Sequence, residues 1–173
     1  MSFVNLKVEG IKILVNWLKN NTTLTSLDIG NNSLGFEGIK ILFDGFKNTS
    51  ISSLNLRNNY LGSAECMKIL ANELKYNTTL TSLNLSDNNI SVENAKILVN
   101  ALKYNTTLTD LNLDLCGLGA EGVAILFKDY NRLTNLSLSY NDFGVEGIVV
   151  LVDCFKNNNS LARINLSWNY LGI

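Results

Sequence analysis

The side chains with the most chemical potential in this chain are three cysteines and scattered aspartates and serines, and histidine is absent. Cys66, Cys116 and Cys154 are odd in number and widely spaced, which argues against a disulfide scaffold or a zinc site. Histidine is the commonest general base and metal ligand, so no nucleophile has an evident activating partner. The sequence also contains no glycine-rich phosphate loop. It therefore predicts no catalytic residue, no metal site and no cofactor, and we do not expect an enzyme.

The most regular feature of the chain is an internal repeat. The pattern L-x-x-L-x-L-x-x-N occurs six times, at steps of 27, 29, 28, 25 and 28 residues. Its copies begin at Leu24, Ile51, Leu80, Leu108, Leu133 and Leu161. Apolar residues alternate inside each copy, which predicts a short strand. An apolar stripe at helical spacing follows, as at Ile39, Leu42, Phe43 and Phe46. Each unit is therefore predicted to be one strand followed by one helix.

Stacking of these units determines the predicted shape. A single strand–helix unit cannot bury its own apolar face, so stability must come from its neighbours. Strands stack at roughly 4.8 Å, whereas packed helices need about 8–10 Å. The array is therefore expected to curve, with the strands on the inside. We predict one domain over residues 1–173, with a leading helix in 1–23, five strand–helix repeats in 24–160 and a trailing strand in 161–173.

The full pattern, L-x-x-L-x-L-x-x-N/C-x-L-G-x-x-G with a period near 28 residues, resembles the ribonuclease-inhibitor-type leucine-rich repeats. Similar repeats occur in ribonuclease inhibitor, the Ran GTPase-activating protein and NOD-like receptors. The resemblance covers about Val8 to Ile173. It implies an α/β solenoid, a right-handed βα superhelix shaped as a horseshoe with a concave parallel sheet and convex helices. It also implies a protein-binding scaffold.

The chain departs from two of these relatives. Ribonuclease inhibitor is rich in cysteine, whereas this chain has three. The Ran activator would imply a functional arginine on a loop and a strongly acidic tail. Here Arg57 and Arg163 fall on predicted strands, and the sequence ends at Ile173.

The ninth position of the pattern is predicted to form a structural ladder. Its residues are Asn32, Asn59, Asn88, Cys116, Asn141 and Asn169. An asparagine amide at the point where the chain leaves a strand can satisfy backbone groups that the turn leaves unpaired. Cys116 is expected to be a small buried thiol. Triplets such as Asn77-Thr78-Thr79 and Asn105-Thr106-Thr107 match the glycosylation pattern, but a repeated Asn-rich motif creates them without that role.

Side chains at the third, fifth, seventh and eighth positions of the pattern are predicted to face the concave side. Most are small and polar, but the eighth position changes to Leu115, Tyr140 and Trp168 toward the C-terminus. Trp, Tyr and Arg are common in binding hot spots. The predicted partner-binding set is Arg57, Asp87, Asp110, Asp114, Leu115, Tyr140, Arg163 and Trp168. Its acidic members would suit a basic partner. The alternative is a solvated surface on which Trp168 covers the open end of the stack.

Composition limits the kinds of partner. The formal net charge is −1, so no global basic field favours nucleic acid or an anionic membrane. No apolar run approaches the roughly 20 residues that a membrane span needs. The N-terminal segment lacks the layout of a signal peptide. We expect a cytoplasmic protein, or one secreted into the cytosol of a host cell if it is a bacterial effector.

Three functions are compatible with these features. The first is an interaction module that binds a protein through the concave face and the C-terminal end. The second is a GTPase-activating-type regulator of a small GTPase. The third is a structural repeat fragment of a larger protein, such as an effector or a receptor. The unpaired edge of the last strand also offers a surface for a homodimer.

Overall fold

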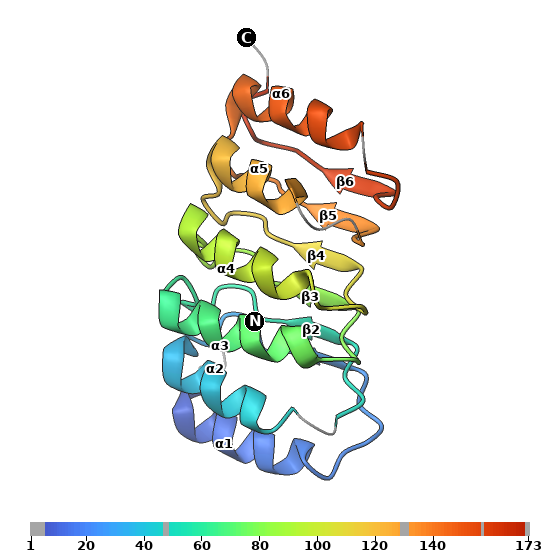
Figure 1. The fold of residues 1–173 in the computed structure, drawn as a ribbon. Coiled ribbons are helices and arrows are strands. Elements are labelled where there is room, and N and C mark those ends of the chain that lie inside the picture. The colour runs from blue at the N-terminus through green and yellow to red at the C-terminus, as the bar shows by residue number, and fades with distance from the viewer. Residues whose placement is uncertain (1–5, 47–48, 129–131, 157, 172–173) are drawn as a thin grey trace.

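The computed structural model describes residues 6–46, 49–128, 132–156 and 158–171. Helices and strands alternate through these residues (Figure 1). The helices are α1 (Lys7–Leu18), α2 (Gly35–Asp44), α3 (Ala64–Tyr76), α4 (Val92–Leu102), α5 (Gly119–Lys128) and α6 (Gly144–Phe155). The strands are β1 (Ser26–Asp28), β2 (Ser53–Asn55), β3 (Ser82–Asn84), β4 (Asp110–Asn112), β5 (Asn135–Ser137) and β6 (Arg163–Asn165). None of these helices has the length and apolar composition that crossing a membrane requires.

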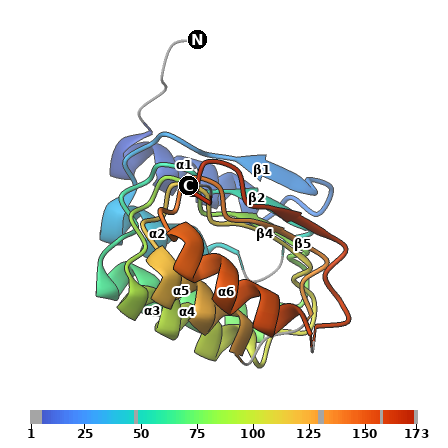
Figure 2. The same ribbon diagram turned by 90° about the horizontal axis from the view of Figure 1, so that it is seen from above.

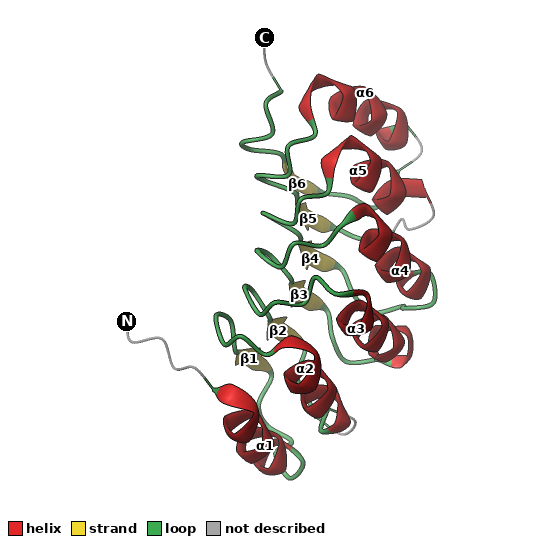
Figure 3. Cartoon of the chain, turned by 90° about the vertical axis from the view of Figure 1, so that its left-hand side faces the viewer, coloured by secondary structure: helices red, strands yellow, loops and turns green. Residues whose placement is uncertain are grey.

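The strands form a parallel sheet in the order of the sequence, β1-β2-β3-β4-β5-β6. Viewed from above, the helices lie on one side of this sheet (Figure 2). In a side view the strands follow the inner side of a curved stack and the helices spread along its outer side (Figure 3). This arrangement confirms the predicted leucine-rich-repeat solenoid. The curvature follows from the smaller spacing of strands than of helices.

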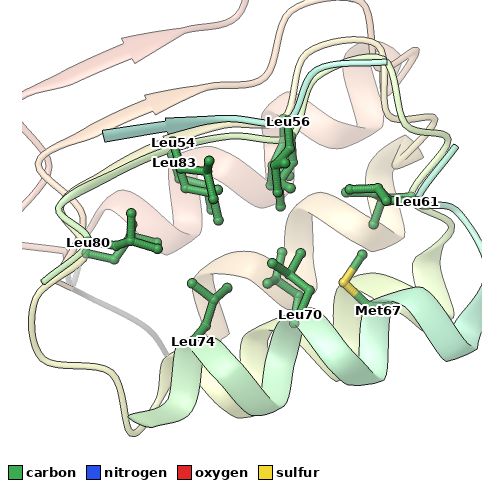
Figure 4. Packing of buried hydrophobic residues seen from close by; sticks show 14 of the residues in the cluster. Leu54, Leu56, Leu61, Met67, Leu70, Leu74, Leu80 and Leu83 are labelled. Atoms are coloured by element: carbon green, nitrogen blue, oxygen red, sulfur yellow. The ribbon is translucent and has the colours of Figure 1, made fainter. Parts of the chain in front are cut away.

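The core is a continuous layer between the sheet and the helices. Leucines of neighbouring strands superpose in rows and point at the helices, and Leu54 and Leu83 lie in one such row (Figure 4). On the helix side, Met67, Leu70 and Leu74 of α3 complete the same layer and are 0–1% exposed. Each such side chain contributes on the order of 1.5–3 kcal/mol of transfer free energy. Because each layer rests on the next, no repeat has a core of its own.

The two glycines of the L-G-x-x-G motif lie in the first turn of a helix and are required for different reasons, as Gly35 and Gly38 of α2 show. Gly35 has φ +54°, a left-handed conformation that glycine adopts without steric cost. Gly38 lies against the turn, where a Cβ atom would come 2.8 Å from Cβ of Leu34. The first glycine therefore allows the chain to turn, and the second allows the helix to pack on the turn.

Candidate partner-binding surface

Buried asparagine amides hold the turn that follows each strand. Nδ2 of Asn88 donates to the carbonyl oxygens of Leu56 and Leu85, at 2.9 Å each. Its Oδ1 accepts the backbone N–H of Asn59 at 2.8 Å and of Leu61 at 3.2 Å. Asn32, Asn59, Asn141 and Asn169 make similar contacts with their own repeat and its neighbours. These amides join consecutive repeats through backbone groups that water does not reach.

Cys116 occupies the fourth place in this column, the one that has no asparagine, and is fully buried. Its thiol donates to the carbonyl oxygen of Leu85 at 3.4 Å, the kind of contact that the amide group makes elsewhere. Its backbone N–H donates to Oδ1 of Asn141. Burial raises the pKa of the Cys116 thiol to about 12. The thiol is therefore protonated at neutral pH and unsuited to act as a nucleophile.

A second set of asparagines shapes the loops between the helices and the strands. Oδ1 of Asn105 accepts the backbone N–H of Thr107 at 3.0 Å and of Leu108 at 2.8 Å. Its Nδ2 donates to the carbonyl oxygen of Leu74 at 2.6 Å, and the residue is 1% exposed. Asn21, Asn77 and Asn158 make the same local contacts. The repeated Asn-X-Thr triplets are thus turn-forming elements of the fold.

The fifth-position side chains close the strand ends. Oδ1 of Asn55, Asn84 and Asn112 accepts the backbone N–H two residues later, at 2.8–3.0 Å. The backbone N–H of Arg57 is one of these donors. The pattern had predicted Arg57 on the strand, and this prediction was wrong, because β2 ends at Asn55 and Arg57 lies in the turn beyond it. Side-chain turns of this kind compete with continued strand structure. They form at the points where β2, β3 and β4 end.

The eighth-position residues sit in the following turn with a left-handed backbone. Asn31, Asn58 and Asp87 have φ of 48–60°, and asparagine and aspartate tolerate this conformation. Three bulky residues follow in the same column, and we call them the apolar ridge: Leu115, Tyr140 and Trp168. Their φ values are 54–57°, and they are 43%, 46% and 71% exposed.

The ridge is energetically unfavourable for the isolated chain. A left-handed conformation costs a bulky residue about 1 kcal/mol or more relative to asparagine. Burial of the partly exposed Leu115 and Tyr140 offsets only part of this cost, and Trp168, at 71% exposed, recovers the least. The Tyr140 and Trp168 rings are stacked, with centroids 5.3 Å apart and planes 9° apart, and such a pair offsets about 0.5–1.5 kcal/mol. Folding alone therefore gives no reason for these residue types.

Tyr170 is a further exposed aromatic residue that the sequence reasoning missed. It lies two residues after Trp168, has φ 53° and is 77% exposed. The signal was present in the tenth position of the pattern, where Tyr60 and Tyr170 stand among small and polar residues. Tyr60 lies in the second turn of the stack, far along the sheet from the ridge.

The charged members of the predicted set fall into separate groups. Arg57 pairs with Asp87 across neighbouring turns, with Nη2 and Oδ2 3.7 Å apart. Oδ1 of Asp114 accepts the hydroxyl of Ser137 at 2.6 Å and the backbone N–H of Ser139 at 2.7 Å. This second contact fixes the residue next to Tyr140, so Asp114 belongs with the ridge.

The third group lies on the floor of the concave face. Asp110 and Arg163 both hydrogen-bond to Asn135, which stands between them on β5. All three line an open groove of about 920 Å³ that extends over β3–β6. Its other polar lining residues include Ser82, Asn84, Asn112, Ser137 and Asn165. The structure therefore brings Asp110, Asp114, Arg163 and the ridge to the C-terminal part of the sheet, and places the Arg57–Asp87 pair in the turns after β2 and β3, where the backbone N–H of Asp87 donates to the carbonyl oxygen of Asp114.

Replacement of Asn88 by alanine tests the ladder. It would leave buried backbone groups of two repeats without partners, so we expect the free energy of unfolding to fall by about 2–4 kcal/mol. The measurement is urea denaturation followed by circular dichroism. Asn72→Ala, on the exposed face of α3, is the matched control and should change stability by less than about 0.5 kcal/mol. Equal effects of the two changes would contradict the role of the ladder.

Alkylation tests the state of Cys116. Because its pKa is about 12, the thiol should not react with iodoacetamide in the folded protein between pH 7 and 9, and should react in urea. The raised pKa also contributes stability below the unfolded-state pKa of about 8.5, which is lost as the pH rises toward 12. Peptide mass spectrometry locates the modified cysteine. Rapid labelling of Cys116 in the native protein would show that burial does not protect it.

Asparagine replacements test the cost of the ridge. Leu115→Asn, Tyr140→Asn and Trp168→Asn each introduce a residue that the left-handed turn favours. We expect stability to be unchanged or to rise by up to about 1 kcal/mol for each change. The reverse change Asn31→Leu should destabilise by a similar amount. A loss of more than about 2 kcal/mol in the asparagine variants would mean that the ridge is a structural element.

Comparisons with known proteins point to the same kind of molecule. The family model described as "Leucine Rich repeat" matches residues 20–42, 76–95, 104–126 and 132–152. The human NACHT, LRR and PYD domains-containing protein 14 is 35% identical over 81 residues, which are 46% of this chain and 7% of that protein. The chain thus spans only a small part of this curated relative.

Solved structures are similar over most of the chain. The leucine-rich repeat-containing protein LegL7 from Legionella pneumophila has a TM-score of 0.69 and 26% identity, over 90% of this chain and 51% of that chain. Leiomodin-1 actin-binding site 2 has a TM-score of 0.61 and 18% identity, over 97% and 81%. The Caenorhabditis elegans tropomodulin C-terminal domain has a TM-score of 0.54 and 16% identity, over 94% and 83%. The last two show a shared fold alone.

Proposed function

Since the chain belongs to the leucine-rich-repeat family, we propose that it is a protein-interaction module whose concave face and C-terminal end bind a macromolecular partner. Proteins of this fold are typically binding scaffolds without enzymatic activity. In this proposal the contact surface consists of the apolar ridge, Asp114 and the groove over β3–β6. The chain supplies a shaped surface and performs no reaction.

The apolar ridge is the single observation that carries this proposal. Its three residues occupy strained backbone positions and expose apolar area to water, although asparagine or aspartate fills the same place in the other repeats. Strain and exposure of this kind are retained where they serve a function. A partner that covers the ridge would recover the burial that the isolated chain lacks. Rigid, exposed aromatic pairs are also typical anchors of protein interfaces.

The groove beside the ridge favours a protein over a nucleic acid. Its lining contains one cationic side chain, Arg163, and one anionic side chain, Asp110. A strand of nucleic acid needs a continuous basic track along its phosphates. The remaining polar residues of the lining are serines and asparagines, which hydrogen-bond well to peptide groups.

Affinity capture followed by a binding titration tests the proposal. The wild-type chain is the bait, and each captured protein is purified and titrated by isothermal calorimetry. We expect Tyr140→Asn and Trp168→Asn to raise Kd by about 30-fold, which is about 2 kcal/mol, because hot-spot residues contribute this much. Tyr60→Asn is the matched control, since Tyr60 is also exposed at a positive φ, and it should leave Kd within about twofold.

A partner whose Kd is unchanged by both ridge replacements would contradict the site. The molar mass measured by light scattering over a concentration series shows whether the C-terminal end binds a second copy of the chain instead of another protein. A dimer that dissociates on Trp168→Asn would mean that the ridge and the edge of β6 bind a second copy of the chain. A monomer at all concentrations would leave the ridge for another protein.

A further inference from the structure

The third position of the repeat changes character along the sheet. It is serine in β1, β2 and β3, and then Asp110, Asn135 and Arg163 in β4, β5 and β6. The parallel register aligns Asp110 with Asn135, and Asn135 with Arg163. Three side chains of different charge therefore stand in a row across the concave face.

These three side chains form one hydrogen-bonded chain. Nε of Arg163 donates to Oδ1 of Asn135 at 2.6 Å. Nδ2 of Asn135 donates to Oδ1 of Asp110, and Oδ2 of Asp110 accepts the hydroxyl of Thr109 at 2.7 Å. The carboxylate fixes the orientation of the amide, and the amide oxygen then fixes the guanidinium plane. Arg163 is exposed, but its position is determined by the two strands beside it.

The outer edge of this guanidinium is left for an external group. Within residues 6–46, 49–128, 132–156 and 158–171, its terminal nitrogens have no hydrogen-bond or ion-pair partner. Arg57 differs, because its Nη2 lies 3.7 Å from the Asp87 carboxylate. The two terminal nitrogens of an arginine match the two oxygens of a carboxylate. Holding the side chain in advance reduces the entropy that binding would cost.

The local charge disfavours a doubly charged group more than a singly charged one. Asp110 lies two strands from Arg163 in the same groove, and Asp114 lies near the same end. A dianionic phosphate would be attracted by one guanidinium and repelled by two carboxylates, whereas a carboxylate carries half that charge. The neutral serines and asparagines of the lining suit the peptide groups that would flank an acidic side chain.

We propose that Arg163 is a carboxylate-binding residue, that Asn135 and Asp110 position it, and that the partner presents an Asp or Glu side chain to the groove. This proposal rests on the proposed function, because the apolar ridge forms the other part of the same surface. Trp168 lies five residues after Arg163 along the chain. At about 3.3 Å per residue the two are up to about 16 Å apart. An extended partner segment would therefore carry its acidic residue within about five positions of an apolar one.

Selection from a displayed library of random 12-residue peptides tests this specificity. Peptides selected on the wild-type chain should be enriched in Asp or Glu next to an apolar anchor. Each is then synthesised with its acidic residue and with the matching amide, Asn or Gln, and titrated by fluorescence anisotropy. The wild type should bind the acidic form at least about tenfold more tightly than the amide form. Arg163→Ala should bind both forms alike.

The positioning role has its own readout. Asn135→Ala leaves the charge of Arg163 in place but removes its anchor. The preference for the acidic over the amide peptide should fall from about tenfold to about threefold or less, with the melting temperature changed by less than a few degrees. Arg57→Ala is the matched control, because Arg57 is already paired, and it should keep the full preference.

The outcomes separate this proposal from the proposed function. Peptides that need Tyr140 and Trp168 but bind equally well to Arg163→Ala would overturn the carboxylate site and leave the ridge as the interface. Selected peptides without acidic enrichment would do the same. Each peptide is also synthesised with phosphoserine in place of its acidic residue, and tighter binding of that form would replace the carboxylate by a phosphate and so contradict the proposal. Failure to select any peptide over the background of the Trp168→Asn variant would overturn both.

Discussion

The rest of the structure depends on one constraint, the need of buried backbone groups for hydrogen-bond partners. Every repeat leaves its strand through a turn whose N–H and C=O groups face the interior. The ninth-position amides meet this need as donors and as acceptors, as Asn88 does for its own repeat and the repeat before it. Because each amide bonds to a neighbouring repeat, the turns can form only when repeats are stacked. The asparagine ladder and the leucine core therefore both stabilise the stack of repeats, and neither stabilises a single repeat by itself.

This division of roles frees other positions to differ between repeats. Leucines fix the sheet against the helices, ninth-position amides fix the turns, and fifth-position Asn or Asp side chains form the turn at five of the six strand ends. The third and eighth positions carry none of these tasks and differ between repeats. Both vary in the same direction, from small polar residues at the N-terminal end to Arg163 and Trp168 at the C-terminal end. The candidate surface lies where both changes coincide.

The same framework accounts for the cysteine and the asparagine content. Cys116 takes the place of an amide, and a buried thiol supplies one weak hydrogen bond to Leu85 in its stead. The Asn-X-Thr triplets serve the loops at the opposite end of the strands, where Asn105 is buried. In the sequence alone, the cysteine suggests a reactive thiol and the triplets suggest sugar attachment. In the structure, both serve backbone hydrogen bonding.

The sequence by itself determined the repeat, the alternation of strand and helix, the curved shape and the column that contains Leu115, Tyr140 and Trp168, because periodic burial is a local property of the chain. Only the tertiary structure decided which side chains meet. Arg57 and Arg163 look alike in the sequence, yet one pairs with Asp87 and the other is held by Asn135. The stacking of Tyr140 on Trp168 and the left-handed backbone beneath them were equally hidden. These features depend on strand register and turn geometry, which bring together residues more than 20 positions apart.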